Sequence, residues 1–437
     1  MKDWKVKRLG EIAEMCLGKM LDKEKNRGDY RPYLANFNVR WGGFDLSALN
    51  KMRFEDHEDE RYGLKDGDLI ICEGGEPGRC AIWRNQVPGM KIQKALHRVR
   101  VRSGYNSEYL YYRMLLAGRI GELDRHFIGS TIKHLTGKGL GDVEFAFPDE
   151  AYQEKIIRIL SSIDEKIDIN NQINAELEQL AKLIYDYWFV QFDFPISAEL
   201  ASKLGNKKLE GKPYRQSGGP MAYNDALKKE IPEGWATSDL GTSVNQIIDH
   251  RGKTPTKLDG DWSSNPEDII ALSAKVVKGG KLIGLQNANR VSRDLYEKWM
   301  PTKLEEGDIL MTSEAPAGEF FLIYGKTEFC LSQRLFGIRA DKAKVQPSYL
   351  YHELSHGYGY HNIMGSLSGS TVFGIRQDNL RAVNILVPDQ SVQTSFEEIA
   401  VPLYKQIRTL ESQNSELSSL RDWLLPMLMN GQVTVTD

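Results

Sequence analysis

One module occurs twice in this chain, and this feature constrains the fold more than any other. Gly67-Asp68 returns as Gly307-Asp308, in each case 240 positions later. The same offset, without a gap, matches Gln93 with Gln333, Tyr109-Leu110-Tyr111 with Tyr349-Leu350-Tyr351, Gly129-Ser130-Thr131 with Gly369-Ser370-Thr371, and Pro148-Asp149 with Pro388-Asp389. Repeats of roughly 20 to 50 residues form solenoids. A repeat this long predicts two copies of one domain, and therefore two similar faces in one polypeptide.

The composition is that of an ordinary soluble globular protein. The chain has 437 residues, 41% hydrophobic and 27% charged, which is enough for several domains. No apolar run approaches the roughly 18 residues of a membrane span, and Met1 to Gly10 do not resemble a signal peptide. We therefore expect a cytoplasmic protein with no membrane partner. The four cysteines show no CxxC pairing, which argues against a zinc ribbon or a disulfide framework.

Charge favours nucleic acid only locally. The net charge of −3 gives no overall attraction to DNA. Between Glu76 and Glu108, however, there is no acid, while this window holds Arg79, Arg84, Lys91, Lys94, Arg98, Arg100 and Arg102. Two interpretations stay open at this point: a DNA-binding surface, or a strand whose basic face is simply solvated.

Each copy is predicted to begin as a mixed α and β domain. Apolar runs at 69–71 and 309–311 follow tight Gly-Asp turns and indicate strands, as does the segment 95–101. Segments 107–117 and 347–354 are predicted to be helices that start at Ser and Pro. The expected fold class is α+β, with two similar mixed domains related by a pseudo-twofold internal repeat.

After Pro148 and Pro388 the apolar pattern becomes a heptad, which predicts a coiled-coil seam in each copy. The two helices most simply pair with each other in antiparallel orientation; the alternative is that each packs only on its own domain. Asn174 and Asn414 would fix the register of the seam. Pro402 is expected to start the second helix, because proline is tolerated only in a first turn. The predicted seam and spacer residues are Ile163, Ile167, Asn174, Leu177, Ile184, Leu403, Ile407, Asn414, Leu417 and Leu424.

These patterns divide the chain into five segments. Gly, Pro and Ser concentrate in the middle, between Phe192 and Pro232, as in a linker. The expected segments are a first domain at 1–148, a central spacer helix at 149–191, a linker at 192–232, a second domain at 233–388 and a C-terminal spacer helix at 389–431.

One motif suggests a catalytic zinc site, but it is incomplete. His352, Glu353 and His356 fit the HExxH pattern, in which two histidines one turn apart bind zinc and the glutamate polarises water. The expected third ligand position holds Asn362, and the first copy has Tyr112 and Leu116 where the histidines would be. No cofactor loop of an amino-methyltransferase occurs either. We expect the chain to catalyse nothing by itself and to bind no metal or cofactor.

The whole chain resembles the specificity subunit of type I restriction-modification systems. The resemblance rests on Trp188 to Pro195, Gly211-Lys212-Pro213-Tyr214, Ser217-Gly218-Gly219, Ile231 to Trp235, and the terminal run Leu424 to Gly431. It implies two target recognition domains that each read one half of a bipartite site in double-stranded DNA. The paired helices would set the spacer and dock two methylation subunits, which in turn carry restriction subunits. S-adenosylmethionine, ATP and Mg²⁺ would belong to those partners.

The DNA-binding candidates follow from charge and repeat position, because cations contact phosphates and Arg, Asn or Gln side chains read base edges. In the first copy they are Arg79, Lys91, Gln93, Lys94, Arg98, Gly129, Ser130, Thr131 and Lys133; in the second they are Lys253, Thr254, Lys275, Gln333, Arg334, Gly369, Ser370, Thr371 and Arg376. The alternatives are a two-headed protein scaffold that binds no DNA and, less favoured, a zinc peptidase.

Overall fold

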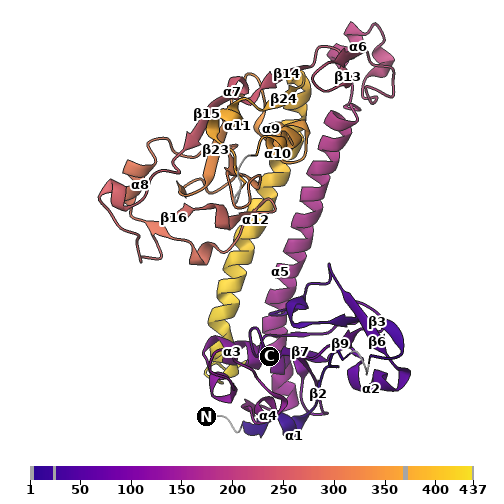
Figure 1. Ribbon diagram of the computed structural model, residues 1–437, viewed down its shortest axis with the longest axis vertical. Helices are drawn as coiled ribbons and strands as arrows, with labels where there is room; N and C mark the ends of the chain where they lie inside the picture. The colour runs from indigo at the N-terminus through magenta and orange to yellow at the C-terminus, as the bar shows by residue number, and fades with distance from the viewer. Residues whose placement is uncertain (1–3, 23–25, 368–372, 436–437) are drawn as a thin grey trace. The chain divides into compact units, whose positions relative to one another are not determined.

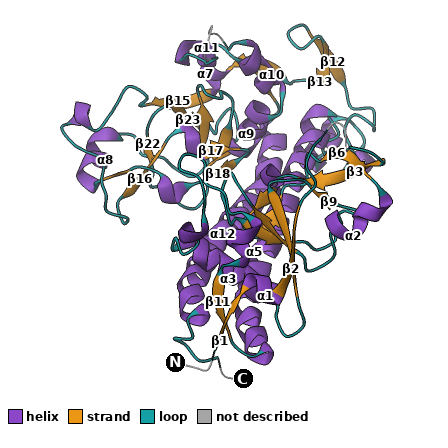
Figure 2. Ribbon diagram, turned by 60° about the horizontal axis from the view of Figure 1, so that its bottom comes forward, coloured by secondary structure: helices purple, strands orange, loops and turns teal. Residues whose placement is uncertain are grey.

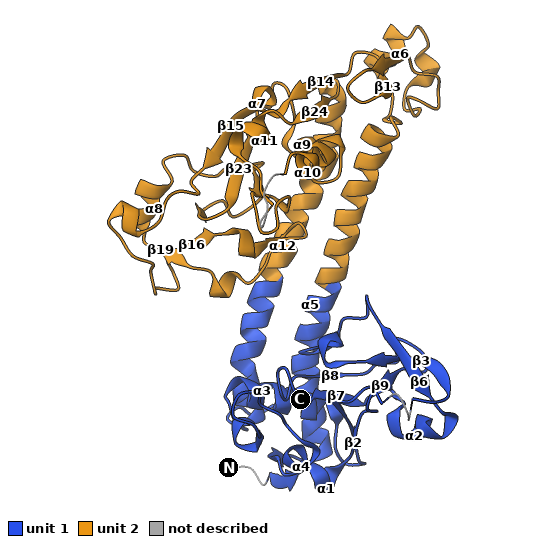
Figure 3. Ribbon diagram, viewed as in Figure 1, with its two compact units in different colours: residues 1–169, 414–437 blue, residues 170–413 orange. Residues whose placement is uncertain are grey.

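The computed structural model of the chain describes residues 4–22, 26–367 and 373–435. Two compact units divide the chain (Figure 3): unit 1 is Met1–Ile169 with Asn414–Asp437, and unit 2 is Asn170–Gln413. Within the described ranges, no helix combines the length and the apolar character that a membrane crossing requires.

Unit 1 contains a four-stranded antiparallel sheet in the order β2-β10-β7-β8 (Figure 1). Its strands are β2 (Ala13–Leu17), β10 (Leu96–Val101), β7 (Leu69–Cys72) and β8 (Cys80–Ile82). Both predicted strands of this copy are confirmed, as is the helix, which is α3 (Ser107–Arg119). The Asn106 side chain accepts the Glu108 N–H at 2.8 Å and so caps this helix.

A smaller sheet in unit 1 has the order β6-β3-β9, with β3 and β9 parallel. The remaining elements are a short hairpin, a strand pair that joins the two ends of the domain, and three one-turn helices. The bounds are β6 (Asn50–Phe54), β3 (Asp29–Leu34), β9 (Lys91–Ile92), β4 (Val39–Arg40), β5 (Gly43–Phe44), β1 (Lys5–Arg8), β11 (Glu144–Phe147), α1 (Leu9–Ile12), α2 (Asp59–Tyr62) and α4 (Gly137–Gly141).

Unit 2 repeats this topology, which confirms the duplication (Figure 2). Its large sheet is β15 (Val244–Asp249), β23 (Leu335–Ala340), β20 (Ile309–Thr312) and β21 (Phe320–Leu322), and its small sheet is β19 (Arg290–Val291), β16 (Ile269–Leu272) and β22 (Cys330–Leu331). The parallel pair recurs as β16 with β22. The other elements are β17 (Val277–Lys278), β18 (Lys281–Leu282), β14 (Ala236–Asp239), β24 (Asn384–Val387), α7 (Leu240–Ser243), α8 (Arg293–Trp299), α9 (Pro347–Ser355), α10 (Tyr358–Gly365) and α11 (Gln377–Arg381).

The predicted gapless offset of 240 is wrong at the turn between β9 and β10 and along β10, where the offset is 239. The Gln93 N–H donates to the Leu34 carbonyl in unit 1, whereas Ser332 N–H donates to the Leu272 carbonyl at the same point of unit 2. One residue fewer therefore precedes this turn in the second copy. The turns correspond as Gln93 with Ser332, Lys94 with Gln333, and Ala95 with Arg334; the last pair both have positive φ, 87° and 63°. The identity of Gln93 and Gln333 does not mark equivalent positions.

Two long helices, here called the spacer helices, complete the fold. The first is α5 (Glu150–Tyr185), which passes into a π-helical turn at Asp186–Val190, and the second is α12 (Gln390–Met429). In unit 1 they pack antiparallel, since Ile156 and Leu160 share a core with Leu425 and Leu428. In unit 2 the end of α5 meets the start of α12, because the rings of Tyr185 and Phe396 lie 6.4 Å apart.

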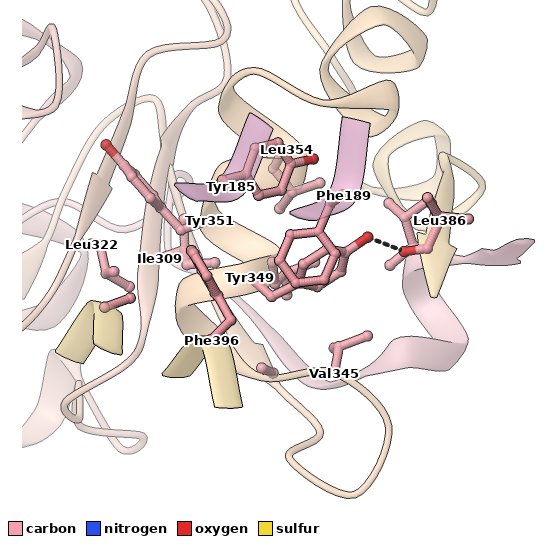
Figure 4. Packing of buried hydrophobic residues seen from close by; sticks show 14 of the residues in the cluster. Tyr185, Phe189, Ile309, Leu322, Val345, Tyr349, Tyr351, Leu354, Leu386 and Phe396 are labelled. Carbon is pink, nitrogen blue, oxygen red and sulfur yellow. Dashed lines mark hydrogen bonds between the residues drawn. The ribbon is translucent and has the colours of Figure 1, made fainter. Parts of the chain in front are cut away.

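The core of unit 2 forms where the spacer helices meet the recognition domain (Figure 4). Phe189 packs against Tyr349 of α9 with ring centroids 4.6 Å apart. The Tyr349 hydroxyl donates to the Leu386 carbonyl at 2.6 Å, so the polar end of this buried ring is satisfied. Aromatic side chains of α5 thereby join α9 and β24 in one core.

The expectation that Pro402 starts a helix is wrong, because α12 runs through Pro402 without interruption. Proline costs a helix interior about 3 kcal/mol. Around it, Phe396, Ala400 and Tyr404 are fully or almost fully buried, and their packing offsets this cost. Pro426 lies in the last turn of α12, which continues to Met429.

The segment 192–232 is folded, although its composition predicts a linker. It contains α6 (Ala198–Lys203) and the hairpin β12 (Met221–Asn224) with β13 (Lys229–Pro232). The rings of Phe194 and Tyr214 stack with centroids 4.6 Å apart. Its few apolar residues thus suffice to anchor it to the core of unit 2.

Candidate nucleic-acid interface

Four segments of unit 2 that are distant in sequence converge on one cavity of 480 Å³, here called the unit 2 hollow. One segment precedes β16, one runs from β16 to β19, one follows β20, and one is the turn between β22 and β23. The side chains that line the hollow and can bind a polar ligand are Trp262, Ser273, Lys275, Asn287, Asn289, Ser332, Gln333 and Arg334. Lys275, Gln333 and Arg334 were predicted from the sequence, and the structure brings these three together.

The turn between β22 and β23 is held rigidly at the rim. The Ser313 N–H donates to the Arg334 carbonyl at 2.9 Å, and Arg334 Nε pairs with Glu314 Oε1 at 2.9 Å. Arg334 nevertheless keeps half of its side chain exposed, 51%. Gln333 and Arg334 also border a second, smaller cavity with Arg251. The turn therefore presents an amide and a cation on a fixed backbone.

The same place in unit 1 carries the same chemical groups. The turn between β9 and β10 presents Gln93 and the exposed Lys94. Beside it, Phe37 is 49% exposed, at the position that Lys275 occupies in unit 2. Asn50, which opens β6 as Asn289 precedes β19, is exposed as well. Both units thus carry a cation, amides and an aromatic ring around this turn, although only Asn50 and Asn289 place the same group at the same position.

Most of the basic window of unit 1 is not available for DNA. Arg98 is fully buried on the central strand β10, where its guanidinium bonds to the carbonyls of Glu60 and Arg61 at 2.9 Å. Lys91 is 3% exposed, and its Nζ pairs with Asp59 at 2.7 Å. Arg79 pairs with Glu76 at 2.9 Å. Arg98 and Lys91 are therefore not available as DNA contacts. Each is neutralised by an acid that is distant in the sequence, Glu14 for Arg98 and Asp59 for Lys91, so the local sequence shows only the unpaired cations.

The Gly129 loop of unit 1 stands out from the domain. Gly129, Ser130, Thr131 and Lys133 are exposed, and the loop is closed by the bridge between Ile128 and His134. Gly129 has φ +98°, and a Cβ there would lie 2.2 Å from the Ile132 carbonyl oxygen, so only glycine fits. Lys133 pairs loosely with Asp124 at 3.6 Å. Its counterpart, Gly369, Ser370 and Thr371, lies outside the described residues.

The other candidates of unit 2 lie apart from the hollow. Lys253 Nζ donates to the Trp299 carbonyl at 2.6 Å, so its ammonium is committed within the protein. Thr254 is half-buried, and its hydroxyl accepts the Lys257 N–H at 3.4 Å. Arg376 is exposed at the start of α11. Of these three, only Arg376 presents its charge to solvent.

Sequence reasoning missed several residues at these two sites. Trp262, Asn287 and Asn289 of unit 2 have no charge and no match at the offset of 240, so no local pattern distinguishes them. Phe37 and Asn50 of unit 1 were missed for the same reason. Exposed aromatic and amide side chains in loops are the available signal, but many loops contain them.

The HExxH residues form a structural hydrogen-bond network. Glu353 Oε1 accepts the N–H groups of Gly359 and Leu386, each at 3.0 Å, and Glu353 Oε2 accepts the Tyr185 hydroxyl at 2.8 Å. His352 Nε2 bonds to the Tyr404 hydroxyl at 2.8 Å, and burial lowers the pKa of His352 well below its ordinary value. Among the described residues, no group of three His, Cys, Asp or Glu could hold a metal ion.

All ten predicted seam residues are buried or half-buried. Ile163, Asn174 and Ile407 are buried, and the others are half-buried: Ile167, Leu177, Ile184, Leu403, Asn414, Leu417 and Leu424. Their role in setting a spacer length stays a prediction.

Known proteins share this arrangement. The family model described as type I restriction modification DNA specificity domain matches residues 1–179 and again residues 232–419. The MjaIX specificity subunit of Methanocaldococcus jannaschii, a type I restriction enzyme subunit, is 23% identical over 100% of this chain and 95% of its own length. The HindI specificity subunit of Haemophilus influenzae is 23% identical over 99% of this chain and 100% of its own. The crystal structure of the S subunit from M. genitalium shares the fold, with a TM-score of 0.55 at 14% identity over 99% of this chain and 97% of that chain.

Proposed function

Because this chain belongs to the type I restriction-modification DNA specificity family, we propose that each of its two units reads one half of a bipartite site in double-stranded DNA. The observation that carries this proposal is the equivalent surface of the two units. Lys94 and Gln93 in unit 1, and Arg334 and Gln333 in unit 2, stand on the same turn of the same fold.

The chemistry of these side chains suits a DNA groove. An amide can bond to adenine through one donor and one acceptor, whereas an arginine donates two hydrogen bonds to the O6 and N7 acceptors of guanine. Lysines contact phosphates, which fix the position of a domain without reading sequence. We assign reading to Gln93 and Asn50 in unit 1 and to Gln333 and Arg334 in unit 2, and phosphate contacts to Lys94 and Lys275.

The spacer helices would set the distance between the half-sites. Both α5 and α12 have one part in unit 1 and the other in unit 2. A helix rises about 1.5 Å per residue, and B-DNA rises about 3.4 Å per base pair. An insertion of one helical turn in both helices would therefore change the preferred spacer.

The outer faces of the spacer helices carry a repeated apolar pair, here called the outer patches. On α5 the patch is Leu180 and Leu183, which are 42% and 62% exposed; on α12 it is Leu420 and Trp423, which are 44% and 62% exposed. The patches lie 240 residues apart, each preceded by Glu-Leu at 176–177 and 416–417. Exposed apolar groups of this size mark protein contacts. We assign one methylation subunit to each patch.

The remaining partners follow from that assembly. Restriction subunits would join through the methylation subunits. S-adenosylmethionine, ATP and Mg²⁺ would act on those partners, and this chain would supply sequence recognition without catalysis.

A binding experiment tests the proposal. The complex of this chain with its methylation subunits is titrated onto a fluorescent duplex that carries both half-sites, at several salt concentrations. Lys94→Ala should weaken binding to all sequences and lower the salt slope by about 1. Gln333→Ala should weaken binding to the intact site by about 1–3 kcal/mol and leave non-specific binding unchanged.

The matched control is Lys65→Ala. Lys65 is also an exposed lysine of unit 1, but it precedes β7, at the opposite end of the sheet from the turn that holds Lys94. An equal loss of affinity in Lys65→Ala and Lys94→Ala would contradict the assigned surface. Binding without any salt dependence would contradict DNA recognition itself.

A further inference from the structure

The interior of the unit 2 hollow, behind the rim that Gln333 and Arg334 form, has the wrong shape for reading an intact duplex. Base edges lie at the bottom of grooves roughly 8 Å deep, so the side chains that read them must protrude from the protein. A concave cavity of 480 Å³ cannot reach into a groove. Its volume lies within the range of about 300 to 1,000 Å³ that is typical of pockets for small ligands. The hollow therefore fits a single small group better than it fits a helix.

The lining of the hollow holds polar groups that the protein itself does not use. The side-chain amides of Asn287, Asn289 and Gln333 have no hydrogen-bond partner among the residues that the structure describes. Each amide offers donors and an acceptor. Other polar side chains of this unit are bound within the protein, as Arg251 is to Asp249 and Arg339 is to Asp308. All three side chains are exposed, so their amides can bond to a group that enters the hollow with its own donors and acceptors.

One wall of the hollow is aromatic. Trp262 is 40% exposed, and its ring lies 5.9 Å from the ring of Trp299, which is buried. The buried Trp299 thus packs against Trp262, which lines the cavity. An indole face stacks on any nucleobase. Lys275 and Arg334 at the same cavity can neutralise a phosphate that follows such a base.

The geometry points to a nucleobase as the occupant of the unit 2 hollow: a base of the bound site, turned out of the duplex, that stacks on Trp262 and bonds to the amides of Asn287 and Asn289. This inference rests on the proposed function and names one group that unit 2 reads. Proteins that turn a base out of the stack recognise it by stacking and by hydrogen bonds to its Watson–Crick edge. No covalent bond forms or breaks in this step.

A mismatch scan tests this inference with the full chain and its methylation subunits. Each base pair of the second half-site is replaced in turn by a mismatch, because a mismatch lowers the cost of unpairing the base that leaves the stack. At one position we expect a mismatch to tighten binding by about tenfold in the wild-type complex. In Asn289→Ala and in Trp262→Phe that gain should fall to within about twofold. If a methylation subunit bound the extrahelical base instead, the mismatch would increase affinity equally in the wild type and in both variants.

The matched control is Gln286→Ala, which removes an exposed amide next to Asn287 that does not line the hollow. Gln286→Ala should keep the full mismatch gain. Specific duplex binding with no position where wild type and hollow variants differ would overturn the inference and leave the proposed function intact. Loss of all specific binding in the wild-type complex would instead contradict the proposed function.

A second experiment distinguishes between two possible occupants of the hollow, an extrahelical base of the duplex and a free nucleotide. dAMP is titrated onto the complex without DNA, and tryptophan fluorescence is compared between wild type and Trp262→Phe. We expect no saturation below millimolar concentrations, since the duplex must deliver the base. Saturable micromolar binding that Trp262→Phe abolishes would assign the hollow to a free nucleotide and overturn the inference.

Discussion

Tyr112 and His352 occupy the same position of the two copies, and each bonds to the same position of the spacer helix that follows it. The Tyr112 hydroxyl donates to Asp164 Oδ2 at 2.7 Å in unit 1, and His352 Nε2 bonds to the Tyr404 hydroxyl at 2.8 Å in unit 2. The chemistry of the pair has changed, but the connection between recognition domain and spacer helix has been kept. This explains why His352 and Glu353, half of the HExxH motif, are buried.

Asp164→Ala should destabilise unit 1. Asp164 also binds Arg421 Nη1 of α12 at 2.7 Å, so its loss leaves the buried Tyr112 hydroxyl without its acceptor and separates Arg421 from α5. The expected loss in the free energy of unfolding is about 2 kcal/mol. Urea unfolding followed by circular dichroism measures it. Glu165→Ala removes the exposed neighbouring acid and should change stability by less than about 0.5 kcal/mol; equal losses in both variants would contradict the role of Asp164.

Glu353→Ala should cost about 3 kcal/mol in the free energy of unfolding, because it leaves two backbone N–H groups and the Tyr185 hydroxyl without an acceptor in a fully buried site. Glu353→Gln keeps the shape and the acceptor, so its loss should be much smaller. Thermal unfolding of the three proteins at neutral pH measures the order. A Gln variant as unstable as the Ala variant would contradict this account of the network.

The comparison of the wild type with Glu353→Gln also predicts how the free energy of unfolding depends on pH. Burial raises the pKa of Glu353 above its ordinary value of 4.5. Between 4.5 and the raised value, the folded state holds a proton that the unfolded state has lost, so stability falls as pH rises through this window. Relative to Glu353→Gln, the wild type should therefore lose stability from pH 4.5 upward and then level off. An increase in relative stability with pH would contradict the assigned direction. Glu398→Gln, at an exposed position of α12, is the control.

The outer patches predict a change in subunit stoichiometry. Trp423→Asp and Leu183→Asp each place a charge in one patch, and each should reduce the complex from two methylation subunits to one in native mass spectrometry. Both side chains are 62% exposed, so the free chain should keep its stability within about 0.5 kcal/mol. Tyr223→Asp changes a residue that is 64% exposed on β12 and should leave the stoichiometry unchanged. Two bound subunits in both variants would exclude these patches as docking sites.

The architecture could be predicted from the sequence because its signals are local and repeated. Strands β7 and β20 follow the duplicated Gly-Asp turns, and the heptads of α5 and α12 extend over many turns. The exceptions have physical causes. Pro402 lies inside a helix because tertiary packing outweighs local preference. The segment 192–232 is folded because a few aromatic residues anchor a Gly-rich chain.

The candidate interface could be predicted only in part. Lys94, Lys275 and Gln333 are exposed in loops, as their position in the pattern suggested. The prediction that Arg98 contacts DNA is wrong, because its neutralising partners, such as Glu14, lie on other strands. These partners are far from Arg98 in the sequence, so a local sequence window cannot show them. The one-residue shift between Gln93 and Gln333 is invisible in the sequence, since both offsets place a polar residue in the turn.

Mapping of methylated adenines in DNA tests the central claim most directly, with cells that carry this chain and its methylation subunits. The account predicts a motif of two short half-sites separated by unspecified bases. It further predicts that Gln93→Ala with Asn50→Ala relaxes one half-site only, and that Gln333→Ala with Asn289→Ala relaxes only the other. A continuous motif, or a motif in which both halves change together in either variant, would contradict two units that read separate halves of one site.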